Sequence, residues 1–393
     1  TLMRESSPTS PRLRRATEPP LGWEKWLLDM VGLATIADMV PLLDENRLLA
    51  KYGLLVMRKS PRVGLQKLCR GMRVEQRAIT EDDVSFMIAP RVNAASRMGD
   101  ARDAFKLFTT ADEDEADMLA KKLEKANRSR KAEAGAITRA VHARLKERGD
   151  VRSIIALGDP EWRPALLGLV AGNIADEFER PVFLWGREGL PAGRQGTGKL
   201  KGSFRSGGST QVMEIIRTTE NMFAQFGGHS AAGGFTLIDT EVFFLEDRLV
   251  EAHTKLASEK IEDDLSQHAD AILTPEEINK SYLTRVEKFA PFGISNPKPV
   301  FLLREVSVRE ISRFGKGNEH LKLKIDVDEG RREIDAVTFF VKGALARTTE
   351  KLSRSARVNL LAHLERDTFS RSSPVRLRLF DIKPVVTQAS GRA

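Results

Sequence analysis

The sequence predicts an α/β protein that ends in a small β-barrel, and three observations predict this class. Apolar residues recur at helical spacing over the first part of the chain, up to about residue 147. Short β-rich runs then alternate with helical segments. The last third contains four segments in which apolar and polar residues alternate, and polar turns separate these segments. With 393 residues, the chain is long enough for two or three domains that each have a core.

Composition and charge narrow the class of protein. Hydrophobic residues make up 41% and charged residues 30%, which is typical of a globular protein, and no apolar run is long enough to span a membrane. Cys69 is the only cysteine, which excludes a disulfide framework or a Cys-rich zinc site and indicates a cytoplasmic protein. The net charge of +8 favours a polyanionic partner.

The first half reads as helical after an irregular start. Residues 1–22 are rich in Ser, Pro and Arg without an apolar period, so we expect a disordered arm or the truncated edge of a longer protein. An apolar stripe from Trp23 leads to a second helix over Asn46–Met57, and a further helix holds Ala104 to Phe108. Residues 111–147 predict one long charged amphipathic helix that connects two domains.

The second half combines strands and helices before becoming all β. The runs SIIALG and PVFLWG predict buried strands on either side of the helix PALLGLVAGNIADEF. Residues 241–268 read as helical again. The barrel strands are expected at His320–Val327, Glu333–Val341, Val358–Glu365 and Val375–Ile382. The last of these places two arginines on one face and apolar residues on the other, which suits an oligonucleotide-binding barrel.

A stretch near residue 200 resembles a nucleotide-binding loop but lacks its chemistry. Gly193, Gly198 and Lys199 have the G-x-x-x-x-G-K spacing. Leu200 stands where a Ser or Thr hydroxyl must bind Mg²⁺, and no helical apolar period follows. We therefore interpret residues 186–200 as a Gly-rich surface insertion and reject an NTPase.

Four segments have residue types suited to phosphate chemistry. Asp38 lies among small and apolar residues near a helix end, where its carboxylate needs a cation, a helix cap or a metal. The loop expected at Pro90–Arg97 contains Arg91, Asn93 and Arg97 among alanines, and guanidinium groups suit phosphate oxygens.

The other two segments are rich in glycine. In Gly202–Ser206, we expect glycine to let backbone amides point at an anion, with serine and arginine completing a phosphate loop. In Gly227–Gly234, four glycines surround His229, which suggests close approach of the backbone to a ligand. Taken alone, each is equally compatible with an ordinary Gly-rich turn.

Together and in this order, the four segments resemble motifs of the RecJ-like single-stranded-DNA-specific exonucleases of the DHH phosphoesterase superfamily. The matching stretches are ATIADMVPL, PRVNAASRMGDA, LKGSFRS and FGGHSAAGGFTL, and FAPFGISNPKPVF is similar to the entry of that family's C-terminal barrel. The resemblance covers roughly residues 23–385.

The resemblance implies a role for each matching residue. Asp38 would be a ligand of a two-metal site that holds Mn²⁺ or Mg²⁺, and Asn93 and His229 would act beside it in catalysis. The DNA and its phosphates would be bound by Arg91, Arg97, Ser203, Arg205, Ser206 and Gly228. The implied substrate is single-stranded DNA with a 5′ end, degraded 5′ to 3′ in repair and recombination, and a single-strand-binding protein or a helicase is the implied partner.

The family's Asp-His-His motif should precede Asp38, and the six histidines include no adjacent pair. Truncation, a split gene and a degenerate relative each account for this, and the metal site is expected to be incomplete. A non-catalytic single-stranded nucleic-acid-binding relative or subunit is therefore the main alternative. A phosphodiesterase of short oligonucleotides or small nucleotides is a third, which the barrel and the long helix disfavour.

The resemblance also implies the domain layout. Residues 23–110 would be the C-terminal part of the DHH catalytic domain, and residues 111–150 a connecting helix. An α/β DHH-associated nucleic-acid-binding domain is expected over 151–265 and an OB-fold domain over 266–393.

Overall fold

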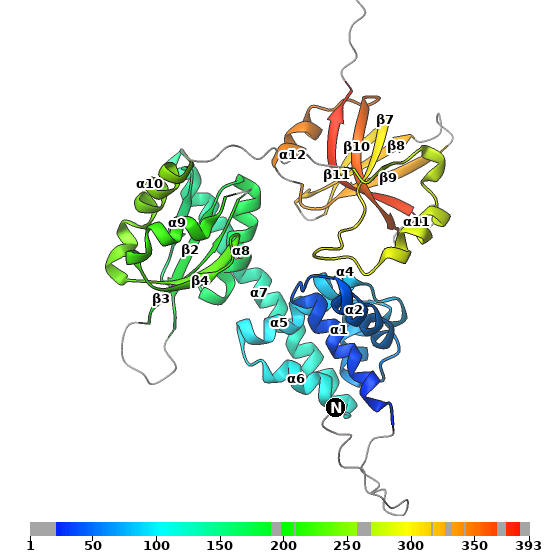
Figure 1. Ribbon diagram of the computed structural model, residues 1–393, viewed down its shortest axis with the longest axis horizontal. Coiled ribbons are helices and arrows are strands. Elements are labelled where there is room, and N and C mark those ends of the chain that lie inside the picture. The colour runs from blue at the N-terminus through cyan, green and yellow to red at the C-terminus, as the bar shows by residue number, and fades with distance from the viewer. Residues whose placement is uncertain are drawn as a thin grey trace, which may run out of the picture. The chain divides into compact units, whose positions relative to one another are not determined.

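The computed structural model describes residues 21–189, 198–207, 210–257, 269–315, 317–326, 332–341, 343–367 and 375–385 (Figure 1). These residues form two compact units. The first unit comprises the described residues up to Asn93 together with Ala101–Glu124 and Phe289–Pro297. The second comprises Ala94–Asp100 and the described residues of Lys125–Lys288 and Lys298–Ala393.

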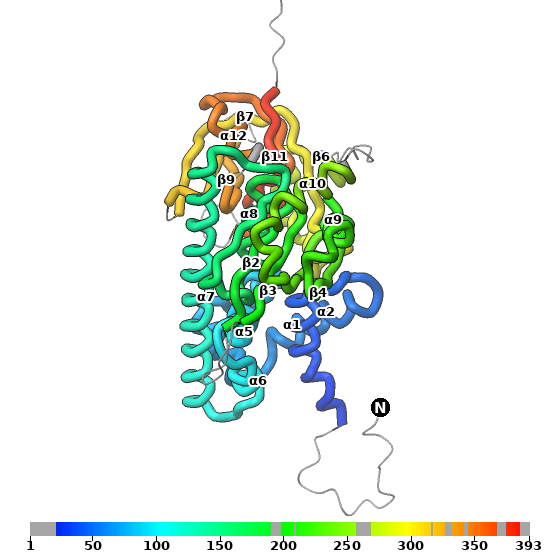
Figure 2. Tube along the Cα trace, turned by 90° about the vertical axis from the view of Figure 1, so that its left-hand side faces the viewer, coloured from blue at the N-terminus to red at the C-terminus, as the bar shows by residue number. Residues whose placement is uncertain are grey.

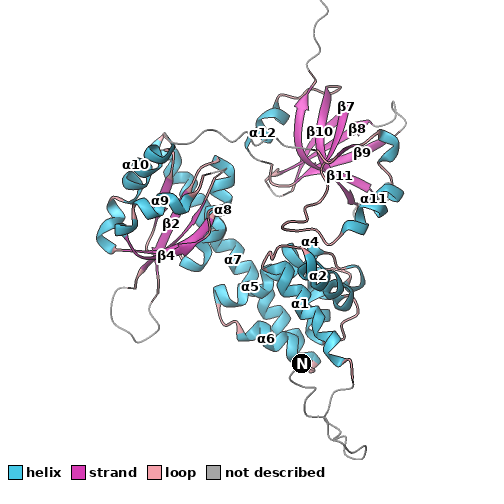
Figure 3. Cartoon of the chain, viewed as in Figure 1, coloured by secondary structure: helices cyan, strands magenta, loops and turns pink. Residues whose placement is uncertain are grey.

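The first unit contains helices and no strand among its described residues (Figure 3). Its α-helices are α1 (Leu28–Ala37), α2 (Asp44–Met57), α3 (Val63–Met72), α4 (Glu81–Asp83), α6 (Arg102–Thr109) and the first part of α7 (Glu113–Arg148). Short 3₁₀ turns lie at Trp23–Leu27 and Gln76–Ala78, and a π-helical turn lies at Val84–Ile88. The apolar stripes predicted from Trp23 and over Asn46–Met57 are thus observed as helices.

A buried carboxylate holds this unit together. Asp29 on α1 is only 1% exposed, and it accepts hydrogen bonds from Ser60 Oγ at 2.6 Å and Arg62 Nε at 2.7 Å. Arg62 also donates to the Phe108 carbonyl at the end of α6. Because an unpaired buried charge is costly, these contacts tie α1, the α2–α3 connection and α6 into one arrangement.

The segment Phe289–Pro297 packs with the first unit. Leu42 N donates to the Ile294 carbonyl at 2.7 Å, and Phe292 N donates to Glu81 Oε1 at 3.1 Å. The Asn296 side chain closes the segment by donating to the Phe289 and Pro291 carbonyls. The residues that follow Asp38 are therefore held by a stretch that is distant in the sequence.

The loop predicted over Pro90–Arg97 is wrong, because this stretch lies in helix α5 (Ala89–Met98). Helix α5 follows directly after the π-helical turn, Pro90 is its second residue, and the alanines beyond Pro90 favour a helix. By contrast, the long helix predicted over 111–147 is confirmed as α7, which is a single continuous helix in Figure 2.

The second unit contains one sheet that is covered by helices on both faces, and we call this sheet with its helices the α/β layer. The strand order of the sheet is β1-β2-β3-β5-β4. Strands β1 and β2 are parallel and the remaining pairs are antiparallel. The strands are β1 (Ile155–Gly158), β2 (Val182–Arg187), β3 (Leu200–Arg205), β4 (Phe223–Gly228) and β5 (Ala232–Leu237). Helix α8 (Pro164–Phe178) and the end of α7 pack on one face, and α9 (Val212–Thr218) and α10 (Leu245–Ala257) pack on the other.

The Gly-rich stretch near residue 200 connects two strands of this sheet. Arg187 pairs with Leu200 at the end of the β2–β3 hairpin, so Lys199 leads into a strand rather than a helix. This agrees with the rejection of a nucleotide-binding loop, which requires a helix there. Three predicted stretches lie outside the described residues: 1–20 of the N-terminal arm, 190–197 of the insertion and 258–268 of the helical segment.

The last part of the chain forms a closed five-stranded barrel. Its strands are β7 (Phe301–Phe314), β8 (His320–Asp326), β9 (Glu333–Thr338), β10 (Arg357–Arg366) and β11 (Val375–Pro384), and β6 (Ala271–Ile272) adds to β7. Pairing of β10 with β7 closes the ring, and α11 (Lys280–Val286) and α12 (Gly343–Glu350) complete the region. Four strands match the predicted segments, whereas β7 was not predicted. No described helix is long and apolar enough to cross a membrane.

Candidate functional site: an arginine pair beneath helix α8

Strand β3 presents two kinds of side chain to its two faces. Ser203 and Arg205 are half-buried and alternate with the buried Gly202 and Phe204. Phe204 packs into the apolar core beneath α9 and α10, so Ser203 and Arg205 face the opposite layer, beneath α8. The motif GSFR therefore contributes one polar pair to one face of the sheet and one apolar pair to the other.

The prediction of a phosphate loop at Gly202–Ser206 and of a ligand-binding loop at Gly227–Gly234 is wrong in its structural part. Gly202 through Arg205 lie within β3, and the second segment is the β4–β5 hairpin with a turn at residues 229–231. The glycines make room for aromatic rings. A Cβ on Gly202 would lie 2.1 Å from the Phe235 ring, and a Cβ on Gly233 would lie 2.3 Å from the Phe204 ring. These glycines thus serve core packing across paired strands.

Two guanidinium groups come together on the α8 side of the sheet. Arg97 at the end of α5 donates from Nη1 to the Ala165 carbonyl of α8 at 2.8 Å. Arg205 donates from Nη1 to the Phe204 carbonyl at 2.7 Å. Burial, and then the positive charge of Arg97, lower the pKa of Arg205. Among the described residues neither arginine has an ion pair.

Three other predicted residues lie at the end of β3 and in the β4–β5 turn that is hydrogen-bonded to it. Ser206 N donates to the Ala231 carbonyl in the β4–β5 turn at 2.8 Å, and Arg205 pairs with Ala232 in the sheet. His229, in the same turn, is exposed and donates its backbone N–H to the Ala232 carbonyl. Gly228 has a φ of 153°, which favours glycine at the start of the turn. The predicted Ser206, Gly228 and His229 thus gather at the end of β3.

The remaining predicted residues belong to the first unit. Asp38 ends α1, it is exposed, and the following Met39 has a positive φ of 52°. No described residue makes a hydrogen bond or ion pair with its carboxylate, which also stands at the negative end of the helix dipole. An N-terminal helix cap is therefore excluded. Asn93 is an exposed residue of α5.

Arg91 differs from the other predicted phosphate ligands. It is 9% exposed, its Nε lies 2.6 Å from Glu124 Oε2, and its Nη1 donates to the Met87 carbonyl. These contacts tie α5 to α7 and occupy the guanidinium group. Phosphate binding by Arg91 stays a prediction, and the geometry of its guanidinium group is that of a structural ion pair.

A metal site was expected at Asp38. In the part of the chain that the structure describes, no three His, Cys, Asp or Glu side chains come close enough together to hold a metal ion. Asp38 as a metal ligand therefore stays a prediction.

The barrel carries a second cluster suited to nucleic acid, which the sequence did not single out. We define the aromatic patch as Phe314, His320, Phe339 and Phe340, whose neighbouring rings are 4.7–5.8 Å apart. Phe340 is 63% exposed. Arg378, one of the two arginines predicted on β11, stacks over Phe339 at 4.3 Å. The two consecutive phenylalanines at 339–340 were the available signal in the sequence.

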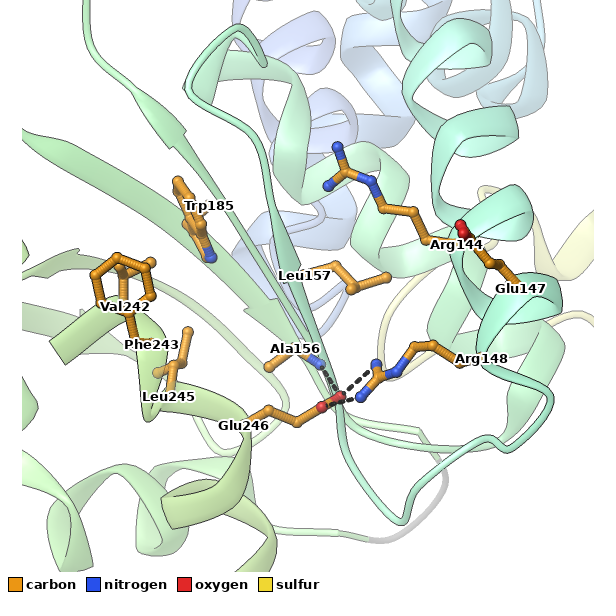
Figure 4. A pocket seen from close by; sticks show the side chains of 10 residues that line it. All are labelled: Arg144, Glu147, Arg148, Ala156, Leu157, Trp185, Val242, Phe243, Leu245 and Glu246. Carbon is orange, nitrogen blue, oxygen red and sulfur yellow. Dashed lines mark hydrogen bonds and ion pairs between the residues drawn. The ribbon is translucent and has the colours of Figure 1, made fainter.

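A hollow of about 540 Å³ lies between α7, β1 and α10 (Figure 4). Three of its four charged side chains are paired: Arg148 forms a two-pronged ion pair with Glu246, and Arg144 Nη2 lies 2.5 Å from Asp159 Oδ2. Glu246 also accepts from Ala156 N at the free edge of β1. These contacts cover a sheet edge, and we assign the hollow no ligand.

Comparison with known proteins identifies relatives of this arrangement. A model of the RecJ OB domain matches residues 269–381. The single-stranded-DNA-specific exonuclease RecJ of Bacillus subtilis is 29% identical over 356 residues, covering 90% of this chain and 44% of that protein. RecJ of Thermus thermophilus is 33% identical over 313 residues, covering 79% of this chain and 43% of that protein.

Solved structures support the same relationship. Those of Thermus thermophilus RecJ in complex with Mg²⁺ and with Mn²⁺ each match with a TM-score of 0.72 at 28% identity. Each match covers 93% of this chain and 53% or 50% of the solved chain. The chain spans about half the length of the relatives it matches. In motif, sequence and fold, the chain is therefore RecJ-like.

Proposed function

We propose that the protein is a metal-dependent exonuclease that degrades single-stranded DNA from the 5′ end during repair and recombination. The arginine pair carries this proposal: Arg97 and Arg205 place two positive charges together without an ion-pair partner among the described residues. Such a pair is stabilised by a phosphate, and the Ser203 hydroxyl beside Arg205 adds a donor. We assign the phosphate at the 5′ end to these three residues.

Asp38 is proposed to hold one of the metal ions. Its exposed carboxylate at the end of α1 has no partner among the described residues, which suits a cation ligand. Bound Mn²⁺ or Mg²⁺ would stabilise charge on the phosphate and activate water. Asn93 and His229 are proposed to orient the DNA backbone, and Ser206 and Gly228 to line its path.

The barrel is proposed to guide the incoming strand. The aromatic patch offers rings on which bases stack regardless of sequence, and the neighbouring Arg378 attracts the phosphate backbone. A single-strand-binding protein or a helicase would supply the strand.

The test uses this chain with a 5′-phosphorylated single strand and Mn²⁺, and it measures both binding and nucleotide release. Asp38→Asn is compared with Glu45→Gln, a control at another exposed acid of the same unit. Release that needs Mn²⁺ and is lost only in Asp38→Asn supports the exonuclease. Release that persists in Asp38→Asn contradicts the metal assignment.

The same experiment decides on the second candidate, a non-catalytic single-strand-binding relative. Tight binding without any release, with or without Mn²⁺, favours that candidate. Absence of binding to either phosphorylated or unphosphorylated strands contradicts both.

A further inference from the structure

Helix α8 has two glycines on the side that faces the arginine pair. Gly168 and Gly172 are one turn apart, and both are half-buried. They are spaced four residues apart, so they lie on the same face of the helix. Helix interiors disfavour glycine relative to alanine, so two glycines at this spacing call for a packing reason.

The side chain of Arg205 supplies that reason. A Cβ added to Gly168 would lie 2.8 Å from Arg205 Nη2 and 3.4 Å from Ser203 Oγ. A Cβ on Gly172 would lie 4.0 Å from Arg205 Cγ, which is an ordinary contact. The guanidinium end of Arg205 thus occupies the space that a side chain at position 168 would fill, while its stem passes Gly172.

The same helix fixes the other arginine. The Ala165 carbonyl, one turn before Gly168, accepts the hydrogen bond from Arg97 Nη1. The first turns of α8 therefore hold Arg97 by a backbone carbonyl and hold Arg205 by the absence of a Cβ. The two guanidinium groups are brought close enough for Arg97 to lower the pKa of Arg205.

We propose that Gly168 is a positioning residue for recognition of the strand's 5′ phosphate: the missing Cβ sets where the Arg205 guanidinium lies relative to Arg97 and Ser203. This inference rests on the proposed function, because it assumes that Arg205 binds the 5′ phosphate. An alanine at position 168 forces the flexible end of Arg205 to move, while the helix and the sheet keep their positions.

The test compares three glycine-to-alanine variants in the full chain. Gly168→Ala removes the space for the guanidinium, Gly172→Ala adds only an ordinary contact, and Gly135→Ala on α7 is the control. The affinity for single strands with a 5′ phosphate and with a 5′ hydroxyl is measured together with the melting temperature.

We expect Gly168→Ala to weaken binding of the phosphorylated strand about tenfold, which is the loss of one hydrogen bond to a charged group. Binding of the hydroxyl-terminated strand should change by less than about twofold, and the melting temperature should stay or rise because alanine favours the helix. Gly172→Ala and Gly135→Ala should bind both strands as the unchanged chain does. A purely structural role of Gly168 would instead lower the melting temperature and weaken both strands equally, which would overturn the proposal.

A double variant tests whether Gly168 acts through Arg205. Gly168→Ala combined with Arg205→Ala should bind no more weakly than Arg205→Ala alone, because the displaced group is already gone. Additive losses would overturn the inference while leaving the role of Arg205 intact. If Arg205→Ala itself leaves binding of the phosphorylated strand unchanged, the proposed function fails at this site.

Discussion

The arginine pair and the aromatic patch differ in what surrounds their arginine side chains. In the α/β layer, Arg205 is partly desolvated beside Arg97, and neither has an ion-pair partner among the described residues. On the barrel, Arg378 stacks on Phe339, while its neighbour Arg376 pairs with Glu365 at 3.2 Å. The first arrangement favours one discrete anion. The second favours an extended strand whose bases stack, so the two regions should contribute separately to binding.

The largest expected effect is the loss of end recognition in Arg205→Ala. Removing a hydrogen-bonded guanidinium from a phosphate costs about 1.5–3 kcal/mol, so affinity for a 5′-phosphorylated strand should fall about tenfold to hundredfold. Fluorescence anisotropy with phosphorylated and hydroxyl-terminated strands measures this. Arg187→Ala is the control, because it removes an arginine of the neighbouring strand β2 that pairs with Asp239, and it should bind as the unchanged chain does. Equal losses for both strand types would contradict a discrete phosphate site.

A smaller effect is expected on the barrel. Phe340→Ala removes the most exposed ring of the patch and should weaken binding of long strands about fivefold, near the lower limit for a stacked base. The preference for a 5′ phosphate should not change. The measurement compares strands of increasing length, with Phe243→Ala as a control at an exposed phenylalanine of the α/β layer. A loss in the phosphate preference would mean that the two regions do not act separately.

Salt dependence sharpens the same distinction. Each phosphate neutralised on a single strand contributes about 0.7 to the slope of log affinity against log salt concentration. Arg205→Ala should therefore reduce the slope by about 0.7, whereas Phe340→Ala should leave it unchanged because stacking releases no counterions. Titrations at several salt concentrations measure both slopes. A reduced slope in Phe340→Ala would show that the patch also organises a phosphate contact.

Strong periodicity made parts of this fold predictable. The helix α7 and four of the barrel strands follow uninterrupted patterns, and each was predicted within a few residues of its observed ends. Strand β7 was missed because its alternation is broken: Arg304 and Glu305 are both exposed between the buried Leu303 and Val306. Glu305 has a φ of 50°, and the register with β10 shifts there. Such a bulge moves the following residues to the opposite face.

The sequence predicts which residues belong to the candidate site, but it does not predict how they are arranged in space. Ser203 and Arg205 were identified from their types and order, but the glycines around them were interpreted as parts of loops. Their partners across the sheet, Phe235 for Gly202 and Phe204 for Gly233, depend on strand register. Register and long-range pairing cannot be read from local composition, and the same holds for the contact of Gly168 with Arg205.

The smallest effect on binding is expected from Arg91→Ala. This variant tests whether Arg91 and Arg97, the two arginines of helix α5, have different roles. The Arg91 guanidinium is held by Glu124 and the Met87 carbonyl, so its loss should leave the affinity for either strand type within about twofold. The free energy of unfolding should instead fall by about 1–3 kcal/mol, because the partly buried ion pair between Arg91 and Glu124 is broken. Urea unfolding measures this free energy. Because Arg91 and Glu124 form one ion pair, the double variant Arg91→Ala with Glu124→Gln should lose much less stability than the sum of the two single losses. A loss of DNA affinity without a loss of stability would contradict the structural role of Arg91. Both arginines of α5, Arg91 and Arg97, would then be assigned to DNA binding.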